Sequence, residues 1–402
     1  MFKLDRKRLP DFFTALSQLR ALYAPIETNG QVLFRKWHEG SEVCLDRLQT
    51  AQSPKGLFFP QSENLVAFKT SGKNITIKDN REKPEPFAVF GVRACDAAGI
   101  GVLDRVFLSE PVDTFYQSRR EEGLLITLAC GEPEETCFCT VFGVDPVQES
   151  LLEDINGGAS QCASRGGAGF AEASNAGFNA CSGAGQDAGQ DTGSGMSDGV
   201  SARSGFGGDI AAWLTEEALY LKASTEKGRV LLEEMKALLE KVEKADEKEL
   251  SAYVEEAARN RDAMPLRELN LEGFDGASLN EKFNSPQWQE LSQACIGCGT
   301  CTFICPTCQC YDIKDYDTGN GVQRYRCWDS CMYSDFTRMA HGNPRTSRVE
   351  RFRQRFMHKL VYFPANNEGA YACVGCGRCL ARCPVSMNIV KVVKSLGVSE
   401  NV

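Results

Sequence analysis

The chain has 402 residues, 42% of them hydrophobic, which is enough to build two or more ordinary cores. Its net charge of −9 argues against nucleic acid or an anionic membrane surface as the main partner, because both would repel it at long range. No apolar run reaches the roughly 18 residues of a transmembrane helix and no signal core follows the N-terminus, so we expect a cytoplasmic protein without membrane insertion.

Residues 1–280 are predicted to form an α+β (or α/β) N-terminal domain. A helical pattern over residues 11–23 precedes short strand-like runs, among them FAVFGV at 87–92 and LLITLA at 124–129. Strands and helices of this length in one region are typical of a sheet covered by helices.

The second part of this domain contains two unusual segments. Residues 156–208 are rich in Gly, Ser and Ala and almost without aliphatic side chains, so they cannot build a core, and we expect an insertion that forms a flexible surface loop. Over residues 228–260, apolar and charged positions alternate at helical spacing, which predicts two surface helices.

Residues 281–402 carry most of the chemistry, because twelve of the nineteen cysteines lie between Cys295 and Cys383. Clustered cysteines in a reducing compartment indicate metal or redox chemistry rather than disulfides. The spacing C-x2-C-x2-C-x3-C-P occurs twice, as CIGCGTCTFICP at 295–306 and as CVGCGRCLARCP at 373–384. This spacing is that of bacterial ferredoxins, so we predict a C-terminal, mostly helical two-cluster ferredoxin-like domain.

The two runs are expected to hold two 4Fe-4S clusters with crossed ligands, because in two-cluster ferredoxins the fourth cysteine of each run ligates the other cluster. The first predicted set is Cys295, Cys298, Cys301 and Cys383. The second predicted set is Cys373, Cys376, Cys379 and Cys305. Structural zinc is the alternative, but zinc sites typically use pairs of cysteines rather than triples followed by Cys-Pro.

Eight other cysteines form two weaker groups. A third cluster is predicted from the thiols near strand ends and turns of the N-terminal domain, with zinc or unligated thiols as alternatives: Cys95, Cys130, Cys137 and Cys139. A fourth cluster is the weakest candidate, because its spacing matches no known pattern and free cysteines are often simply buried: Cys308, Cys310, Cys327 and Cys331.

The basic stretch HGNPRTSRVERFRQRFMHK at 341–359 is typical of a solvated helix face. A functional interpretation is a docking patch for an acidic partner or a positive field near a cluster. The three histidines show no ligand spacing, and no nucleotide, flavin or hydrolase motif is present, so we expect no catalytic residue.

Five motif blocks together resemble the family of 4Fe-4S dicluster electron-transfer subunits that includes sulfhydrogenase β subunits and the related iron-sulfur subunits of anaerobic sulfite reductases. The blocks are FGVRACDAAGIGVLDRVF, LLITLACGEPEETCFCT, CIGCGTCTFICPTCQC, RCWDSCMYSDF and CVGCGRCLARCPV. The resemblance strengthens the prediction of a third cluster, because its four cysteines lie inside the family's blocks. The insertion and Cys327 depart from the family's pattern.

What the resemblance implies is an iron-sulfur subunit of an anaerobic, cytoplasmic multisubunit oxidoreductase. Such a subunit relays electrons between a flavin subunit that handles NAD(P)H and a catalytic subunit, either a hydrogenase, a sulfite reductase or a heterodisulfide-reductase-like module. The alternative is a reductase in its own right, acting on a sulfur substrate at an additional cluster. A zinc-dependent nucleic-acid module is a third hypothesis, disfavoured by the acidic balance and the triple-cysteine runs.

Overall fold

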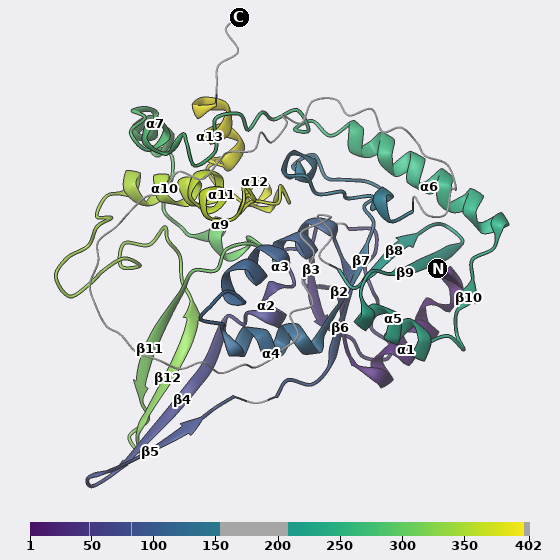
Figure 1. Ribbon diagram of the computed structural model, residues 1–402, viewed down its shortest axis with the longest axis horizontal. Coiled ribbons are helices and arrows are strands. Elements are labelled where there is room, and N and C mark those ends of the chain that lie inside the picture. Colours follow the sequence, from purple (N-terminus) through teal and green to yellow (C-terminus); the bar gives the residue numbers. More distant parts are fainter. Residues whose placement is uncertain (48, 82, 153–207, 398–402) are drawn as a thin grey trace, which may run out of the picture. The chain divides into compact units, whose positions relative to one another are not determined.

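The apolar runs of the N-terminal region form a mixed eight-stranded sheet (Figure 1). The computed structural model describes residues 1–47, 49–81, 83–152 and 208–397. Neighbouring strands β8, β7, β6 and β2 are parallel, whereas the outer strands pair antiparallel. In order across the sheet, the strands are β10 (Glu240–Lys241), β1 (Phe2–Asp5), β9 (Ala218–Ala223), β8 (Ile210–Leu214), β7 (Gly123–Leu128), β6 (Phe87–Val92), β2 (Ala21–Thr28) and β3 (Gln31–Lys36).

Helices cover both faces of this sheet, which explains why every residue of β6 and β7 is buried. Ala88 and Phe90 of β6 pack with one group of helices, while Phe87 and Val89 pack with the other. The first group is α1 (Leu9–Leu19) and α5 (Glu226–Glu234). The second group is α2 (Lys55–Phe58), α3 (Ala94–Phe107) and α4 (Thr114–Glu122).

The predicted elements of this region lie close to the observed ones. The run at 87–92 is β6, and the run at 124–129 is shifted by one residue from β7. Helix α1 begins two residues before the predicted start and ends at Leu19. Over the second half of the region, α5 is followed by α6 (Lys244–Asp262), and α5 buries Leu231 and Leu232. Apart from Gly208, the predicted insertion at 156–208 lies outside the described residues.

A second, antiparallel sheet joins segments that are far apart in the chain (Figure 1). Its strands, in order, are β11 (Tyr311–Asp317), β12 (Val322–Trp328), β4 (Ser62–Ser71) and β5 (Asn74–Asp79). The hairpin β11–β12 is inserted between the two cysteine runs, and β12 pairs directly with β4 of the N-terminal region. The sheet therefore spans the expected boundary at residue 280, and that boundary stays a prediction.

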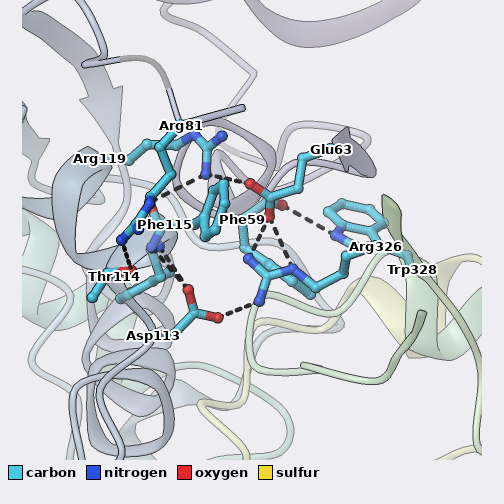
Figure 2. Close-up of polar contacts among 10 residues, drawn as sticks. Phe59, Glu63, Arg81, Asp113, Thr114, Phe115, Arg119, Arg326 and Trp328 are labelled. Carbon is cyan, nitrogen blue, oxygen red and sulfur yellow. Dashed lines mark hydrogen bonds and ion pairs between the residues drawn. The ribbon is translucent and has the colours of Figure 1, made fainter. Parts of the chain in front are cut away.

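Arg326 of β12 holds this hairpin against the N-terminal region (Figure 2). Its guanidinium forms ion pairs with Glu63 of β4 and with Asp113, the N-cap of α4. Glu63 also accepts a 2.9 Å hydrogen bond from Arg119, and the ring of Phe59 lies 5.1 Å from the Arg326 guanidinium. Breaking a buried network of this kind leaves charge uncompensated, so the position of the hairpin is well defined.

Short helices pack around a small core in the C-terminal region. They are α7 (Leu279–Phe283), α8 (Gln287–Leu291), α9 (Thr300–Phe303), α10 (Arg348–Met357), α11 (Phe363–Asn366), α12 (Arg378–Ala381) and α13 (Ile389–Leu396). Trp288 stacks on Phe356 of α10, and Ser347 and Glu350 cap α10 reciprocally. A π-helical turn, His358–Tyr362, continues α10. The predicted α+β class with a helical C-terminal region is confirmed, with the hairpin β11–β12 as an addition.

Candidate metal centres

Four cysteines from the two runs line one cavity. They are the first predicted set, called the first site below: Cys295, Cys298, Cys301 and Cys383. Gly297 and Gly299 have φ angles of 71° and 75°, which glycine adopts without a Cβ penalty, so the loop turns sharply between its cysteines. The fold thus brings the last cysteine of the second run to the first three of the first run.

The first site lies at the protein surface. Cys298 is exposed, and the neighbouring Ile296 is 62% exposed. The hydroxyl of Thr300 lies 3.4 Å from the Cys298 sulfur, and this hydrogen bond lowers the pKa of the thiol. The backbone N–H of Met387 donates to the Cys383 sulfur over 3.3 Å. At Cys298 the contact favours thiolate, which is the form that binds metal.

The second predicted set, called the second site, also comes together: Cys373, Cys376, Cys379 and Cys305. Burial raises the pKa of the Cys373 thiol to about 12, and the charges of Cys379 and Cys305 add to this effect. The thiols of Cys376 and Cys379 each interact electrostatically with Cys305 as well. The predicted crossing of ligands is therefore present in the fold at both sites, while ligation itself stays a prediction.

The four N-terminal cysteines, called the N-terminal site, line a second cavity: Cys95, Cys130, Cys137 and Cys139. Cys95 follows β6 and Cys130 follows β7, and the carboxyl ends of adjacent parallel strands meet at one edge of a sheet. Burial raises the pKa of Cys137 to about 11, so a metal would have to displace the proton. Cys376 of the second site lines the same cavity.

Arg378 connects the second site to the N-terminal region. Its guanidinium forms a buried ion pair with Asp96, with one hydrogen bond of 2.7 Å, and donates to the backbone oxygen of Thr50 over 2.9 Å. Gln49 donates to the backbone oxygen of Cys376 over 2.8 Å. Sequence patterns did not single out these residues, although Arg378 lies between two predicted ligands.

Three of the four weakest candidates lie together, whereas Cys327 lies apart. Tyr311 pairs with Trp328 across the hairpin β11–β12, which brings Cys310, just before β11, to Cys331, just after β12. A hydrogen bond with Cys331, supported by nearby lysines, lowers the pKa of Cys310 to about 7. Cys308 interacts with Cys305 and Cys310.

Cys327 is a residue of β12 and follows the alternation of that strand. Its charged neighbours are Lys314, Asp312 and Asp329, so it is on the side of the strand away from Trp328 and Lys55. We call Cys308, Cys310 and Cys331 the inner cysteines; a fourth cluster that includes Cys327 stays a prediction.

The basic stretch at 341–359 does not form a solvated face along its whole length. Arg355 and Lys359 are 3% and 4% exposed, respectively, and Arg355 lines the cavity of the first site. Burial opposes the charge of Lys359, but the sulfurs of Cys305, Cys308 and Cys373 outweigh it and raise its pKa. The solvated-face interpretation is therefore wrong at these two positions, because they belong to the turns that pack against the cysteines.

The side chains at these sites fit 4Fe-4S clusters, which take four thiolates and accept hydrogen bonds at their sulfides. Among the residues that the structure describes, no three His, Cys, Asp or Glu side chains lie close enough together to hold a single metal ion. The two cavities are instead lined by thiols: four at the first site, and four together with Cys376 at the N-terminal site. Next to the first of them, the buried Nε of Arg355 has no hydrogen-bond acceptor in the described chain, as expected of a donor to a bound cluster.

Comparison with known proteins agrees with this geometry. Residues 294–387 match the family model of a 4Fe-4S dicluster domain. This segment is a 4Fe-4S dicluster domain. Over 393 residues, which are 97% of this chain and 96% of the relative, the chain is 28% identical to sulfhydrogenase 2 subunit beta of Pyrococcus furiosus. The resemblance to dicluster subunits is thus confirmed, and the dicluster domain accounts for two 4Fe-4S clusters.

No solved structure matches the chain. Among the described helices, none combines the length and the apolar character that crossing a bilayer requires.

Proposed function

We propose that this chain is a non-catalytic electron-transfer subunit of a multisubunit oxidoreductase. The observation that carries the proposal is the contact between successive cysteine sites. Cys376 of the second site also lines the cavity of the N-terminal site. Arg355 lines the cavity of the first site, and its charge acts on the Cys379 thiol of the second. The three sites therefore follow one another in space in the order N-terminal site, second site, first site.

Bound 4Fe-4S clusters would supply one-electron donors and acceptors at these sites. The residues of the chain hold them next to one another and limit the access of water to the second site. Buried Val374 and Arg378 cover the second run, while exposed Ile296 and Cys298 leave the first site open toward a partner. A buried site between two others is suited to relay electrons, and an exposed site to exchange them.

The partners are proposed from the resemblance and from the P. furiosus relative, whose name marks it as a β subunit of a hydrogenase. One partner is a flavin subunit that handles NAD(P)H, and the other is a catalytic redox subunit: a hydrogenase, a sulfite reductase or a heterodisulfide-reductase-like module. We propose that the complex works in an anaerobic cytoplasm. The third cluster, at the N-terminal site, belongs to the same proposal.

The test is the metal content and electron exchange of the full chain purified without oxygen. We expect about eight iron and eight sulfide per chain from the dicluster domain alone, and about twelve of each with the N-terminal site occupied. The chain should also carry electrons from a reduced flavoprotein to a viologen dye with which the flavoprotein reacts slowly. Protein that holds only zinc, or that accepts no electrons, would contradict the proposal.

A second candidate function is reduction of a sulfur substrate at the inner cysteines. It is favoured by the convergence of Cys308, Cys310 and Cys331, which a plain dicluster domain does not need. Polysulfide is the probe, with reduced viologen as the electron source, since each sulfur released as sulfide takes two electrons. Turnover that a Cys310→Ser variant loses while keeping the iron of the dicluster domain would support this function; no turnover by the chain alone would exclude it.

A further inference from the structure

Lys359 has an unusual surrounding for a buried lysine. An ammonium has three N–H donors, and all three find acceptors here. Its Nζ lies 3.3 Å from Cys305 Sγ, 2.7 Å from Thr307 Oγ1 and 2.9 Å from the backbone oxygen of Ala372. Thr307 in turn donates to the same Ala372 oxygen over 2.7 Å. The charge is thus held in one position and pointed at a sulfur of the second site.

The charge of Lys359 has no carboxylate partner within the described part of the chain. A buried charge is costly unless an opposite charge compensates it. For the buried Arg378 and Arg326 that compensation is a carboxylate, Asp96 and Glu63 respectively. At Lys359 the available anions are the sulfurs of the second site, so the fold supplies a positive charge that only an occupied site balances.

The other buried cations near these sites act differently. Lys55 donates to the Cys308 backbone oxygen over 3.0 Å and lies 4.2 Å from the Trp328 ring. Arg355 lines the first cavity and its charge acts on the Cys379 thiol, so it affects both the first and the second site. Arg378 borders the second and N-terminal sites, but Asp96 neutralises it. Lys359 differs from them because its ammonium donates directly to a sulfur of the second site, Cys305 Sγ.

We propose that Lys359 sets the reduction potential of the cluster held at the second site. As a result, this cluster is reduced before the clusters at the first and N-terminal sites. One-electron reduction adds a negative charge to a cluster, and a nearby fixed cation and an N–H···S hydrogen bond stabilise the reduced form. The first electron to enter the chain therefore rests at the middle site, whose cysteines are all less exposed than Cys298 of the first site. This inference rests on the proposed electron-transfer function.

The test is an EPR-monitored redox titration of the full, cluster-loaded chain, comparing wild type with Lys359→Met and Lys359→Arg. In Lys359→Met, the potential of the second site should move to more negative values, while the first and N-terminal sites keep theirs. Lys359→Arg keeps the charge and should restore most of the wild-type potential. A Cys305→Ser variant identifies which signals belong to the second site.

A matched control is Lys282→Met. Lys282 is also 4% exposed and lies in the same region, but it forms an ion pair with Glu281 and donates to the Leu396 backbone oxygen. Its replacement should leave all potentials unchanged. If Lys359→Met does not keep its iron, Thr307→Val, which removes one acceptor of the ammonium, should give a smaller negative shift.

An unchanged second-site potential in an iron-replete variant would overturn the role of Lys359, and so would an equal shift at every site. Full iron content in the wild type together with such a result would leave the electron-transfer function intact. Missing clusters in the wild type would instead refute that function.

Discussion

The two cysteine runs have the same spacing but opposite surroundings. Ile296 of the first run and Val374 of the second occupy the same motif position, yet they are 62% and 5% exposed. A Cβ on Gly297 would meet no atom within 4 Å, whereas a Cβ on Gly375 would lie 2.3 Å from the backbone oxygen of Phe138. The spacing determines what each run binds, and the surroundings determine what each site can contact.

This difference separates an exchange site from a relay site. The first run faces outward around Cys298, so a partner can approach it directly. The second run is covered by the loop that carries Cys137 and Cys139, and the backbone N–H of Phe138 donates to the Gly375 oxygen over 2.9 Å. Electrons reach a site covered in this way mainly through the neighbouring sites.

The largest expected effect is the loss of one site by a single substitution. Cys383→Ser should remove about four iron atoms per chain. Because Cys383 lines the first cavity, the lost EPR signal should be the one that Cys298→Ser also loses. Cys44→Ser, at a cysteine that instead hydrogen-bonds to Asp46, should keep all iron. If Cys383→Ser lost the same signal as Cys376→Ser, the crossing would be wrong.

The buried ion pair of Arg378 with Asp96 attaches the second cysteine run to the N-terminal region, and a single substitution can break it. Asp96→Asn leaves the buried Arg378 without its carboxylate, which should cost about 3–5 kcal/mol of the free energy of unfolding. Asp315→Asn removes the partner of Arg324 in an exposed, solvent-screened pair and should lower the free energy of unfolding far less. Anaerobic thermal unfolding of the two variants measures the contrast. Equal midpoints would mean that the second run does not depend on this contact.

Glycine substitutions compare the two runs position by position. Gly375→Ala combines a positive φ with a backbone clash and should destabilise the protein by about 2–5 kcal/mol. Gly297→Ala has the same strain but open space, so about 1–2 kcal/mol is expected. Thermal midpoints and iron retention give the measurement. A larger loss for Gly297→Ala would reverse the assignment of covered and open runs.

The smallest expected effect concerns pH and the cations near the second run. Burial, Lys359 and Arg345 lower the pKa of His358 to about 4, from 6.5. The unfolded chain therefore binds more protons in this window, so the stabilisation is complete above about pH 6.5 and declines as the pH falls toward 4.

Between pH 7.5 and 5.5 this linkage amounts to about 1 kcal/mol. His358→Gln should make the thermal midpoint less sensitive to acid over that range. His341→Gln, at an exposed histidine, should not change this sensitivity. Identical pH profiles for wild type and His358→Gln would contradict the lowered pKa.

Local patterns predicted the parts of the protein that depend on neighbours in the sequence. The ferredoxin runs and strands β6 and β7 are of this kind, and so is the position of Cys95 and Cys130 near strand ends. Burial of Lys359 was not predictable in this way, since a basic helix has the same sequence whether it faces solvent or a cluster. The position of Cys327 also depends on the pairing of β12 with β4, which joins residues more than 250 positions apart.

The most direct test of the account is the EPR spectrum of the fully reduced chain. Reduced clusters at adjoining sites are expected to couple magnetically, so the wild-type spectrum should show interaction splitting. Removing the middle site with Cys376→Ser should abolish that splitting and leave simple, isolated signals. A wild-type spectrum that is the plain sum of uncoupled signals, or an iron content below that of two clusters, would contradict a continuous path for electrons through this protein.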